Sequence, residues 1–281
     1  MVKIISDSTC DLTPELLHQY DIGIIPLYVR LGEEEYLDRL NIVPDDIYKW
    51  SDENEKTPST AAPSVEDIIK IIKSFDADEY VIFTISASMS SCYSNCMLAA
   101  EELAMEDKIH VIDSMSLSTG MGHLVIEAAK KAEQGKTAKE IADYVIALRP
   151  YVRASFVVDT LTYLHRGGRC SGVAALLGNA LKIHPRISVV SGAMRPENKY
   201  RGLPHKYISD YVKDMEEDLK SAKRDRVFIT HSGCDAEIVK MVKDYLVSLG
   251  HFDEIYETRA GSVISSHCGP GTLGVLFIKS E

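Results

Sequence analysis

The sequence predicts an α/β fold of two domains: an N-terminal, doubly wound, mostly parallel sheet over residues 1–155 and a C-terminal mixed-sheet α+β domain over residues 156–281. Short apolar runs alternate with amphipathic helix patterns in the first half, as in a parallel sheet covered on both faces. In the second half strand patterns outnumber helix patterns, and one pair has the form of a hairpin. The chain of 281 residues is also about twice as long as a typical domain.

The expected helices of the first half have recognisable starts. Thr13 precedes Pro14 as an N-cap, Ser64 caps a helix whose isoleucines share one face, and residues 137–140 ("TAKE") form a capping box. The polar stretch 51–64 is expected to be a loop. The expected strands are "VKIISDS", "IGIIPLYVR", "YVIFTI" and "IHVIDS", and Pro26 in the second of them indicates an edge strand or a strand boundary.

The second half contains more strand patterns than helix patterns. Two long helices are expected near residues 204–223 and 235–249, and Ser191-Gly192 is expected to be a hairpin turn. The expected strands are "SFVVDTL", "RISVVSGAMRPENKY", "RVFITHS", "DEIYETR", "VISSH" and "TLGVLFIK".

Composition excludes several classes of protein. A net charge of −11 argues against a nucleic-acid partner. No apolar run reaches about eighteen residues, so we expect no membrane span. The start "MVKIISDST" lacks a signal-peptide core, which favours a cytoplasmic location. The six scattered cysteines fit reduced thiols, and their spacing does not favour a metal site.

The segment "TISASMSSCYSN" (84–95) contains many serines at the expected connection between a strand and the following helix. Ligands of open α/β sheets bind at the carboxyl ends of strands. If Ser90 caps the helix, the backbone N–H groups of Ser91 and Cys92 favour an anion. An ordinary cap with incidental serines explains the segment equally well. Thr60, between two prolines, is on its own more typical of a turn than of a binding site.

Two further features could carry chemistry. Cations are dense over residues 163–201, which include Arg169, Arg186 and Arg201; this indicates either a phosphate or acidic-partner site or a solvated face. His267 precedes a Gly-Pro-Gly turn. A lone histidine is usually structural, and the chain has no G-x-S-x-G elbow.

Nine segments, in order along nearly the whole chain, resemble the bacterial DegV family. Their order makes the resemblance specific, although each segment alone is weak. The segments are "IISDSTCDLTPE", "IPLYVRLGEEEYLD", "STAAPS", "SASMSSCYSN", "VIDSMSLSTGMG", "LTYLHRGGR", "LKIHPRI", "KYRG" and "SHCGPGTLGV".

The resemblance implies a long-chain fatty acid enclosed between two domains, in a protein that serves as the fatty-acid-binding subunit of bacterial fatty acid kinase. Such a carrier has no catalytic residues, metal or cofactor of its own. It presents the carboxylate to a separate kinase, which makes an acyl phosphate for phospholipid synthesis. By resemblance, Thr60, Ser90 and His267 hold the carboxylate with backbone near Ser91. Arg169 and Arg201 would then face the kinase or phosphate.

The chain departs from the family pattern at several positions, and an alternative function stays open. Ala61 and Ala62 stand where Ser-Gln is usual, Ser91-Cys92 where Gly-Thr is usual, and His184 and Arg186 where Lys and Ile are common. The alternative is a Ser-His hydrolase or acyltransferase that uses Ser90 and His267. A nucleotide-binding regulator is disfavoured, since neither a Walker loop nor G-x-G-x-x-G is present.

Overall fold

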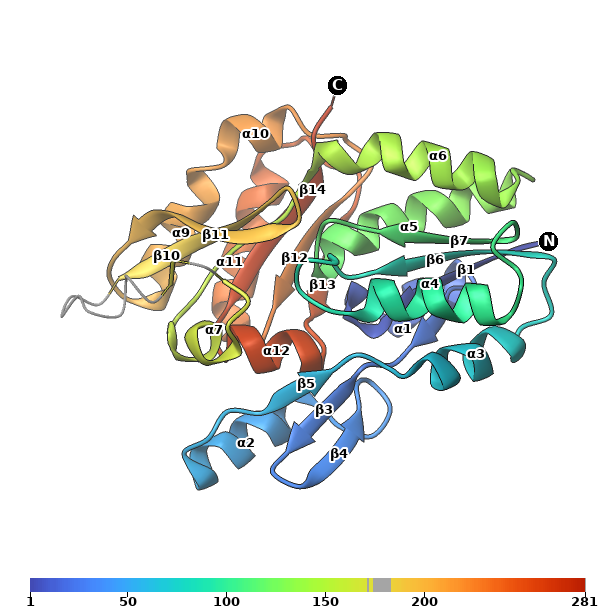
Figure 1. Cartoon of the computed structure of the whole chain (residues 1–281). Helices are drawn as coiled ribbons and strands as arrows, with labels where there is room; N and C mark the ends of the chain where they lie inside the picture. The colour runs from blue at the N-terminus through green and yellow to red at the C-terminus, as the bar shows by residue number, and fades with distance from the viewer. Residues whose placement is uncertain (171, 174–182, 281) are drawn as a thin grey trace.

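The computed structural model describes residues 1–170, 172–173 and 183–280, and it confirms an α/β fold with one parallel and one mixed sheet (Figure 1). The parallel sheet has the order β2-β1-β6-β7. Its strands are β1 (Val2–Asp7), β2 (Gly23–Ile25), β6 (Glu79–Thr84) and β7 (Ile109–Asp113).

Helices cover both faces of the parallel sheet because successive side chains of a strand point to opposite faces. Ile4 and Phe83 pack with α1, α5 and α6, whereas Ile5 and Ile82 pack with α3 and α4. These helices are α1 (Pro14–Gln19), α3 (Val65–Lys73), α4 (Cys92–Glu102), α5 (Ser118–Glu133) and α6 (Ala138–Leu148), and a short 3₁₀ turn, η1 (Ser8–Cys10), follows β1.

The local start signals are confirmed at three helices and corrected at one. Thr13, Ser64 and Thr137 each accept a backbone N–H of the first turn through their side-chain oxygen. The expected cap Ser90 is displaced by one residue: α4 begins at Cys92 with Ser91 at the N-cap position.

A small antiparallel sheet lies below the parallel sheet in Figure 1, in the order β4-β3-β5. It consists of β3 (Tyr28–Leu31), β4 (Glu34–Leu37) and β5 (Ser59–Ala61), with α2 (Pro44–Asn54) beside it. Two expectations are corrected here. "IGIIPLYVR" is two strands in different sheets rather than one strand, although the boundary that Pro26 indicated is confirmed, since proline has no N–H for a ladder. The expected loop 51–64 contains the end of α2 and the strand β5.

The mixed sheet has the order β11-β10-β9-β14-β12-β13, and β8 pairs with β14. Among the described strands of this sheet, only β12 and β13 pair in parallel. Its strands are β8 (Val152–Arg153), β9 (Ser155–Val157), β10 (His184–Val190), β11 (Ala193–Tyr200), β12 (Val227–His231), β13 (Ile255–Arg259) and β14 (Leu273–Ile278). The hairpin turn at Ser191-Gly192 is confirmed; both residues have positive φ, as a tight hairpin requires.

The helices of this half are α7 (Thr162–Gly167), α9 (Pro204–Lys213), α10 (Glu216–Lys220), α11 (Ala236–Ser248) and α12 (Ser262–Cys268), and a 3₁₀ turn, η2 (Arg149–Tyr151), precedes β8. Two expectations are wrong. The expected helix 204–223 is two helices, and "VISSH" is part of α12 rather than a strand. Among the helices so described, none is long and apolar enough to cross a membrane.

Helix α5 joins the two halves. Its buried residues pack with the parallel sheet on one side and with Phe228 and Leu276 of the mixed sheet on the other. The Nε2 atom of His123 lies 3.0 Å from the carbonyl oxygen of Leu276, and the hydroxyls of Thr119 and Thr230 are 2.7 Å apart. Because one helix serves both sheets, the division into domains 1–155 and 156–281 stays a prediction.

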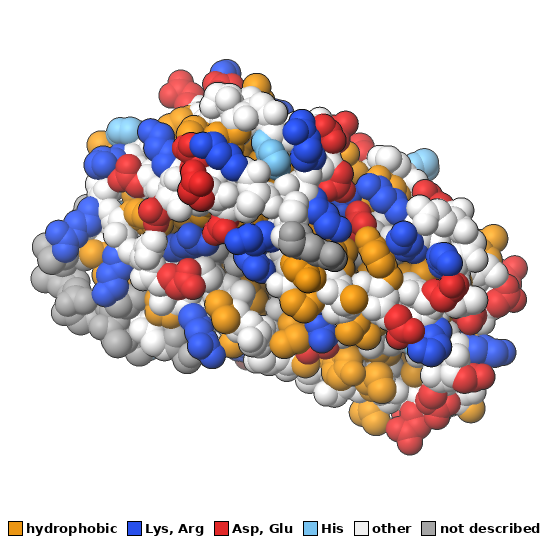
Figure 2. All heavy atoms as spheres, turned by 90° about the horizontal axis from the view of Figure 1, so that it is seen from above, with side chains coloured by type: hydrophobic (Ala, Val, Ile, Leu, Met, Phe, Trp, Pro, Cys, Tyr) orange, Lys and Arg blue, Asp and Glu red, His pale blue; other side chains and the backbone are white. Residues whose placement is uncertain are grey.

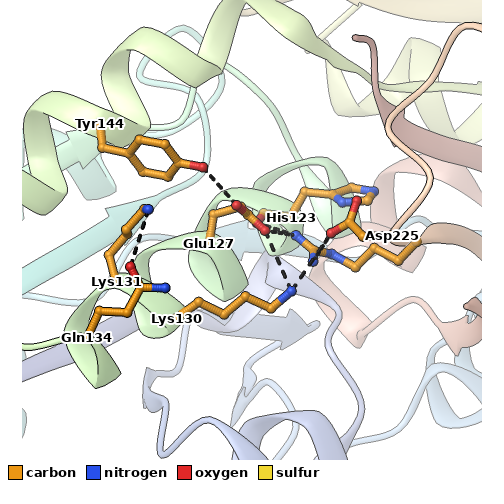
Figure 3. Close-up of polar contacts among 8 residues, drawn as sticks. His123, Glu127, Lys130, Lys131, Gln134, Tyr144 and Asp225 are labelled. Carbon is orange, nitrogen blue, oxygen red and sulfur yellow. Dashed lines mark hydrogen bonds and ion pairs between the residues drawn. The ribbon is translucent and has the colours of Figure 1, made fainter. Parts of the chain in front are cut away.

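A partly buried ion cluster reinforces this junction (Figure 3). Arg226, which is 4% exposed, donates from Nη2 to Glu127 Oε1 at 2.7 Å and from Nη1 to Asp225 Oδ2 at 2.6 Å. Tyr144 donates to the other Glu127 oxygen at 2.9 Å. Burial favours the neutral acid, but the Arg226 charge and these hydrogen bonds outweigh it and lower the pKa of Glu127.

Candidate functional site

A cavity of about 290 Å³ lies where α4, β5 and α12 meet. Four of the residues expected at the site line it: Thr60, Ser90, Ser91 and His267. Arg169 lines it as well, and the remaining wall is mainly apolar. The apolar wall comprises Leu27, Ala61, Ala62, Ile85, Met89, Leu117, Met194, Val263, Ile264 and Cys268.

Backbone pairing and a side-chain tie hold the N-terminal wall of the cavity. Thr60 lies on β5, where it pairs with Val29 of β3. Asn95 of α4 donates to the Pro63 carbonyl at 2.8 Å, which keeps the loop after β5 beside the start of α4. Ser90 accepts the Cys92 N–H at 3.2 Å through its hydroxyl oxygen, so its O–H hydrogen remains available to a ligand.

Two buried aspartates hold α12, and with it His267. Asp11 accepts the Gly261 N–H and Asp38 accepts the Ser262 N–H, both at 2.7 Å. Burial raises the pKa of Asp11 to about 7 and also raises that of Asp38. These carboxylates belong to segments far from α12 in the sequence and satisfy N–H groups that no helical carbonyl reaches.

The central polar contact of the cavity joins Thr60 and His267. Thr60 Oγ1 lies 2.8 Å from His267 Nε2. Burial and then the positive charge of Arg169 lower the pKa of His267 to about 4, so the ring is neutral at neutral pH. Within the described part of the chain its Nδ1 atom has no hydrogen-bond partner and lies against Gly167, where any Cβ would overlap the ring.

The cationic residues of 163–201 do not form one patch. Arg169 is exposed at the cavity and donates to the Gly167 carbonyl at 2.7 Å. Arg201 is exposed just after β11 and is not part of the cavity wall. His184 is buried and stacks on Tyr207 with ring centroids 3.8 Å apart. Arg186 lines a different cleft.

Sequence reasoning missed the residues that support the site. Nothing in the local pattern marks Met89 or Met194 as cavity wall, since apolar residues at such spacing usually belong to a core. Asp11 and Asp38 could have been noticed as acids beside apolar runs. Among the residues with described positions, no group of three or more potential metal ligands occurs.

The geometry can bind a small anionic head group with an apolar tail. The polar atoms of Thr60, Ser90 and His267 are uncharged, and the wall behind them is apolar. A smaller space of about 20 Å³ shares Leu117, Ile264 and Cys268 with the cavity and extends towards Phe156 and Leu276.

Comparisons with known proteins agree with this fold. The family model described as "Uncharacterised protein, DegV family" matches residues 1–280. The chain is 30% identical to a DegV domain-containing protein of Clostridium perfringens over 99% of this chain and 98% of the relative. It is 31% identical to a protein of Thermotoga maritima named "Fatty acid-binding protein", over 97% of this chain and 96% of the relative.

A solved structure gives the same result. The fatty-acid-binding DegV family protein of Thermus thermophilus superposes with a TM-score of 0.91, at 29% identity and 99% coverage of both chains. Fatty-acid binding is therefore a property of members of this family. With a family model that spans residues 1–280 and relatives matched over nearly their whole length, the chain belongs to the DegV family.

Proposed function

We propose that this chain binds a long-chain fatty acid in the cavity between α4, β5 and α12, and that it presents the carboxylate to a partner kinase. The observation that carries the proposal is the 2.8 Å contact between Thr60 and His267 at the polar end of an otherwise apolar cavity. A carboxylate with an apolar tail needs this combination.

The protonation state of His267 determines which hydrogen is offered to the ligand. Because Nδ1 has no partner among the described residues, the ring hydrogen is best placed on Nε2, where it is donated to Thr60. The Thr60 hydroxyl is then free to donate its own hydrogen to a carboxylate oxygen. Ser90 is in the same position, since its oxygen already accepts the Cys92 N–H.

The apolar wall stabilises the tail. Each methylene group moved out of water contributes about 0.8 kcal/mol. The small space towards Phe156 adjoins the cavity through the shared residues Leu117, Ile264 and Cys268, and it would take the far end of a longer chain if its walls moved apart. Uncharged donors suit this arrangement, because they bind the carboxylate without bringing a second charge into the apolar cavity.

Arg169 and Arg201 supply positive charge outside the apolar wall. Arg169 lies exposed beside His267, where the phosphate of a developing acyl phosphate would find a cation. The sequence resemblance implies that members of this family work with a kinase. The position of Arg169 and this resemblance together support a reaction in which a separate enzyme transfers a phosphoryl group from ATP to the bound carboxylate, with ADP and the acyl phosphate as products.

The alternative, a Ser-His hydrolase, has less support. His267 Nε2 contacts Thr60 rather than Ser90, and no carboxylate of a described residue reaches its Nδ1 atom. A base needs such a group to orient it and to stabilise its protonated form.

Displacement of a fluorescent fatty-acid analogue tests ligand binding. Thr60→Val with Ser90→Ala should weaken affinity roughly tenfold or more at each site, because each lost donor to a charged group costs about 1–3 kcal/mol. Ser59→Ala, on the same strand but outside the cavity wall, should leave affinity unchanged. A folded double variant with wild-type affinity would show that neither Thr60 nor Ser90 binds the ligand.

A coupled assay with ATP and a fatty acid kinase subunit tests presentation. Arg201→Ala should retain fatty-acid affinity but lower acyl-phosphate formation, whereas His267→Ala should impair both. Full coupled activity in Arg201→Ala would show that this arginine is an ordinary surface residue with no role in presentation. Ester hydrolysis by the isolated protein that disappears in Ser90→Ala would favour the hydrolase.

A further inference from the structure

A second cavity of about 520 Å³ lies between the end of β7, the turn η2 with β8, and the hairpin of β10 and β11. It shares no lining residue with the cavity that contains Thr60 and His267. Three arginines line it: Arg149, Arg153 and Arg186. We call it the arginine cleft.

The charge in the arginine cleft is opposite to that of the whole chain. Among the described residues that line it, Glu197 is the one acidic side chain, so these three arginines and one glutamate sum to +2 in a protein whose net charge is −11. Basic and acidic side chains otherwise lie interspersed on the face seen in Figure 2. A local surplus of arginine therefore requires its own explanation.

The arginines of the cleft are incompletely satisfied by the protein. Arg149 donates to the Asp113 carbonyl at 2.7 Å, and Arg153 donates to the carbonyls of Pro150 and Val152. Neither forms an ion pair with any residue of the described ranges 1–170, 172–173 and 183–280. Each guanidinium has five N–H donors, so both retain donors for an anion.

Arg186 shows the strongest sign of a missing partner. Its side chain is 17% exposed, and its Nε atom is buried without a hydrogen-bond partner in the described structure. Arg186 forms an ion pair with Glu197, but the 3.7 Å between Nε and Oε2 is longer than a hydrogen bond, and the same Glu197 oxygen accepts the Ser188 hydroxyl at 2.6 Å. A buried N–H donor without a hydrogen-bond partner is costly, and a bound anion that accepted from the Arg186 Nε atom would remove this cost.

We propose that the arginine cleft binds the phosphate group of a small, hydroxyl-bearing phosphate ester. Guanidinium forks match phosphate oxygens, and a surplus of two positive charges matches a phosphate dianion. Glu197 adds the acceptor that a ligand hydroxyl needs. The cleft is also larger than a bare phosphate requires and falls within the range of small-molecule sites.

Isothermal titration calorimetry at low ionic strength tests the proposal, with glucose 6-phosphate as the probe and glucose as the uncharged control. Wild-type protein should bind glucose 6-phosphate saturably, inorganic phosphate should compete, and glucose should not bind. Arg186→Met and Arg149→Gln should each weaken binding roughly tenfold or more, since each removes a charge-assisted donor. Glu197→Gln should weaken glucose 6-phosphate more than inorganic phosphate.

A matched control variant makes the result specific. Arg195→Gln removes an exposed arginine of β11 that does not line the cleft, and it should leave binding unchanged. If Arg186→Met fails to fold, Arg153→Gln replaces it. No saturable binding to wild-type protein, or the same loss in Arg195→Gln as in the cleft variants, would overturn the proposal. If Arg149→Gln keeps the wild-type fatty-acid affinity in the displacement assay, the two cavities bind their ligands independently.

Discussion

Removing the negative charge of Glu127 should destabilise the junction between the two sheets. In Glu127→Gln, Arg226 would stay 4% exposed but would lose its contact to a carboxylate whose side chain is only 13% exposed. Breaking a buried ion pair costs about 3–5 kcal/mol. Asp225 still contacts Arg226 and is 41% exposed, so we expect a value near the lower end, about 3 kcal/mol.

Urea unfolding followed by circular dichroism measures this loss. With a slope of about 3 kcal/mol per molar urea, the midpoint should fall by about 1 M. Glu133→Gln is the matched control, because it lies exposed on the same helix and should change stability by less than about 0.5 kcal/mol. Removing both partners in Glu127→Gln with Arg226→Met should recover part of the loss, since no unpaired charge then remains buried.

The contribution of Glu127 to stability should also depend on pH. The pKa of Glu127 is lowered in the folded protein, so its contribution is present above the unfolded value near 4.5 and is lost as pH falls through the folded pKa. If Glu127→Gln unfolds within about 0.5 kcal/mol of the wild type at neutral pH, the ion pair does not stabilise the junction and the argument fails.

Three further results are expected. Burial lowers the pKa of His123 to about 3, so below pH 6.5 only the unfolded chain protonates this ring; stability should fall by about 3 kcal/mol between pH 7 and pH 4, and His123→Gln should lack that part of the acid loss. In Gly167→Ala the new methyl group should push against the ring of His267 and lower the fatty-acid affinity measured by displacement of the fluorescent analogue. In Gly168→Ala the methyl group meets open space, so only the stability should fall, by about 1 kcal/mol, because the φ of this residue is positive. Asp38→Asn should lose about 1–3 kcal/mol in urea unfolding, since an amide cannot accept both hydrogen bonds of the carboxylate; an unchanged midpoint would contradict this role.

Features set by neighbouring residues were predictable from the sequence. The capping residues Thr13, Ser64 and Thr137 act within one helical turn, and the hairpin at Ser191-Gly192 depends on local backbone conformation. The buried strands of the parallel sheet were predictable because apolar runs of that length have few alternatives.

Features set by distant residues were not predictable. "VISSH" is rich in β-branched and small residues, yet it is helical because Asp11 and Asp38 accept the N–H groups at the start of α12. Likewise, Thr60 and His267 are 207 positions apart. Only the family resemblance brought them together in the prediction, and their roles as ligand-binding residues stay predictions.

The run of cations in 163–201 could not be interpreted from charge alone. Arg169 and Arg186 line different cavities, and His184 is stacked in the interior. Lys182 lies outside the described residues. Charge density along a chain does not tell which side of a strand or loop each cation will take.

The position of β14 affects the order in which the protein can be built during translation. β14 follows every other strand of the mixed sheet in the sequence, yet it lies between β9 and β12. Until the ribosome has released it, the group β9-β10-β11 and the pair β12-β13 share no backbone ladder, and each exposes an unpaired edge. Such late, long-range pairing is slow. The nascent chain therefore passes through a stage in which the two parts of the mixed sheet are not yet joined, and the sheet is completed only when β14 pairs with both β9 and β12.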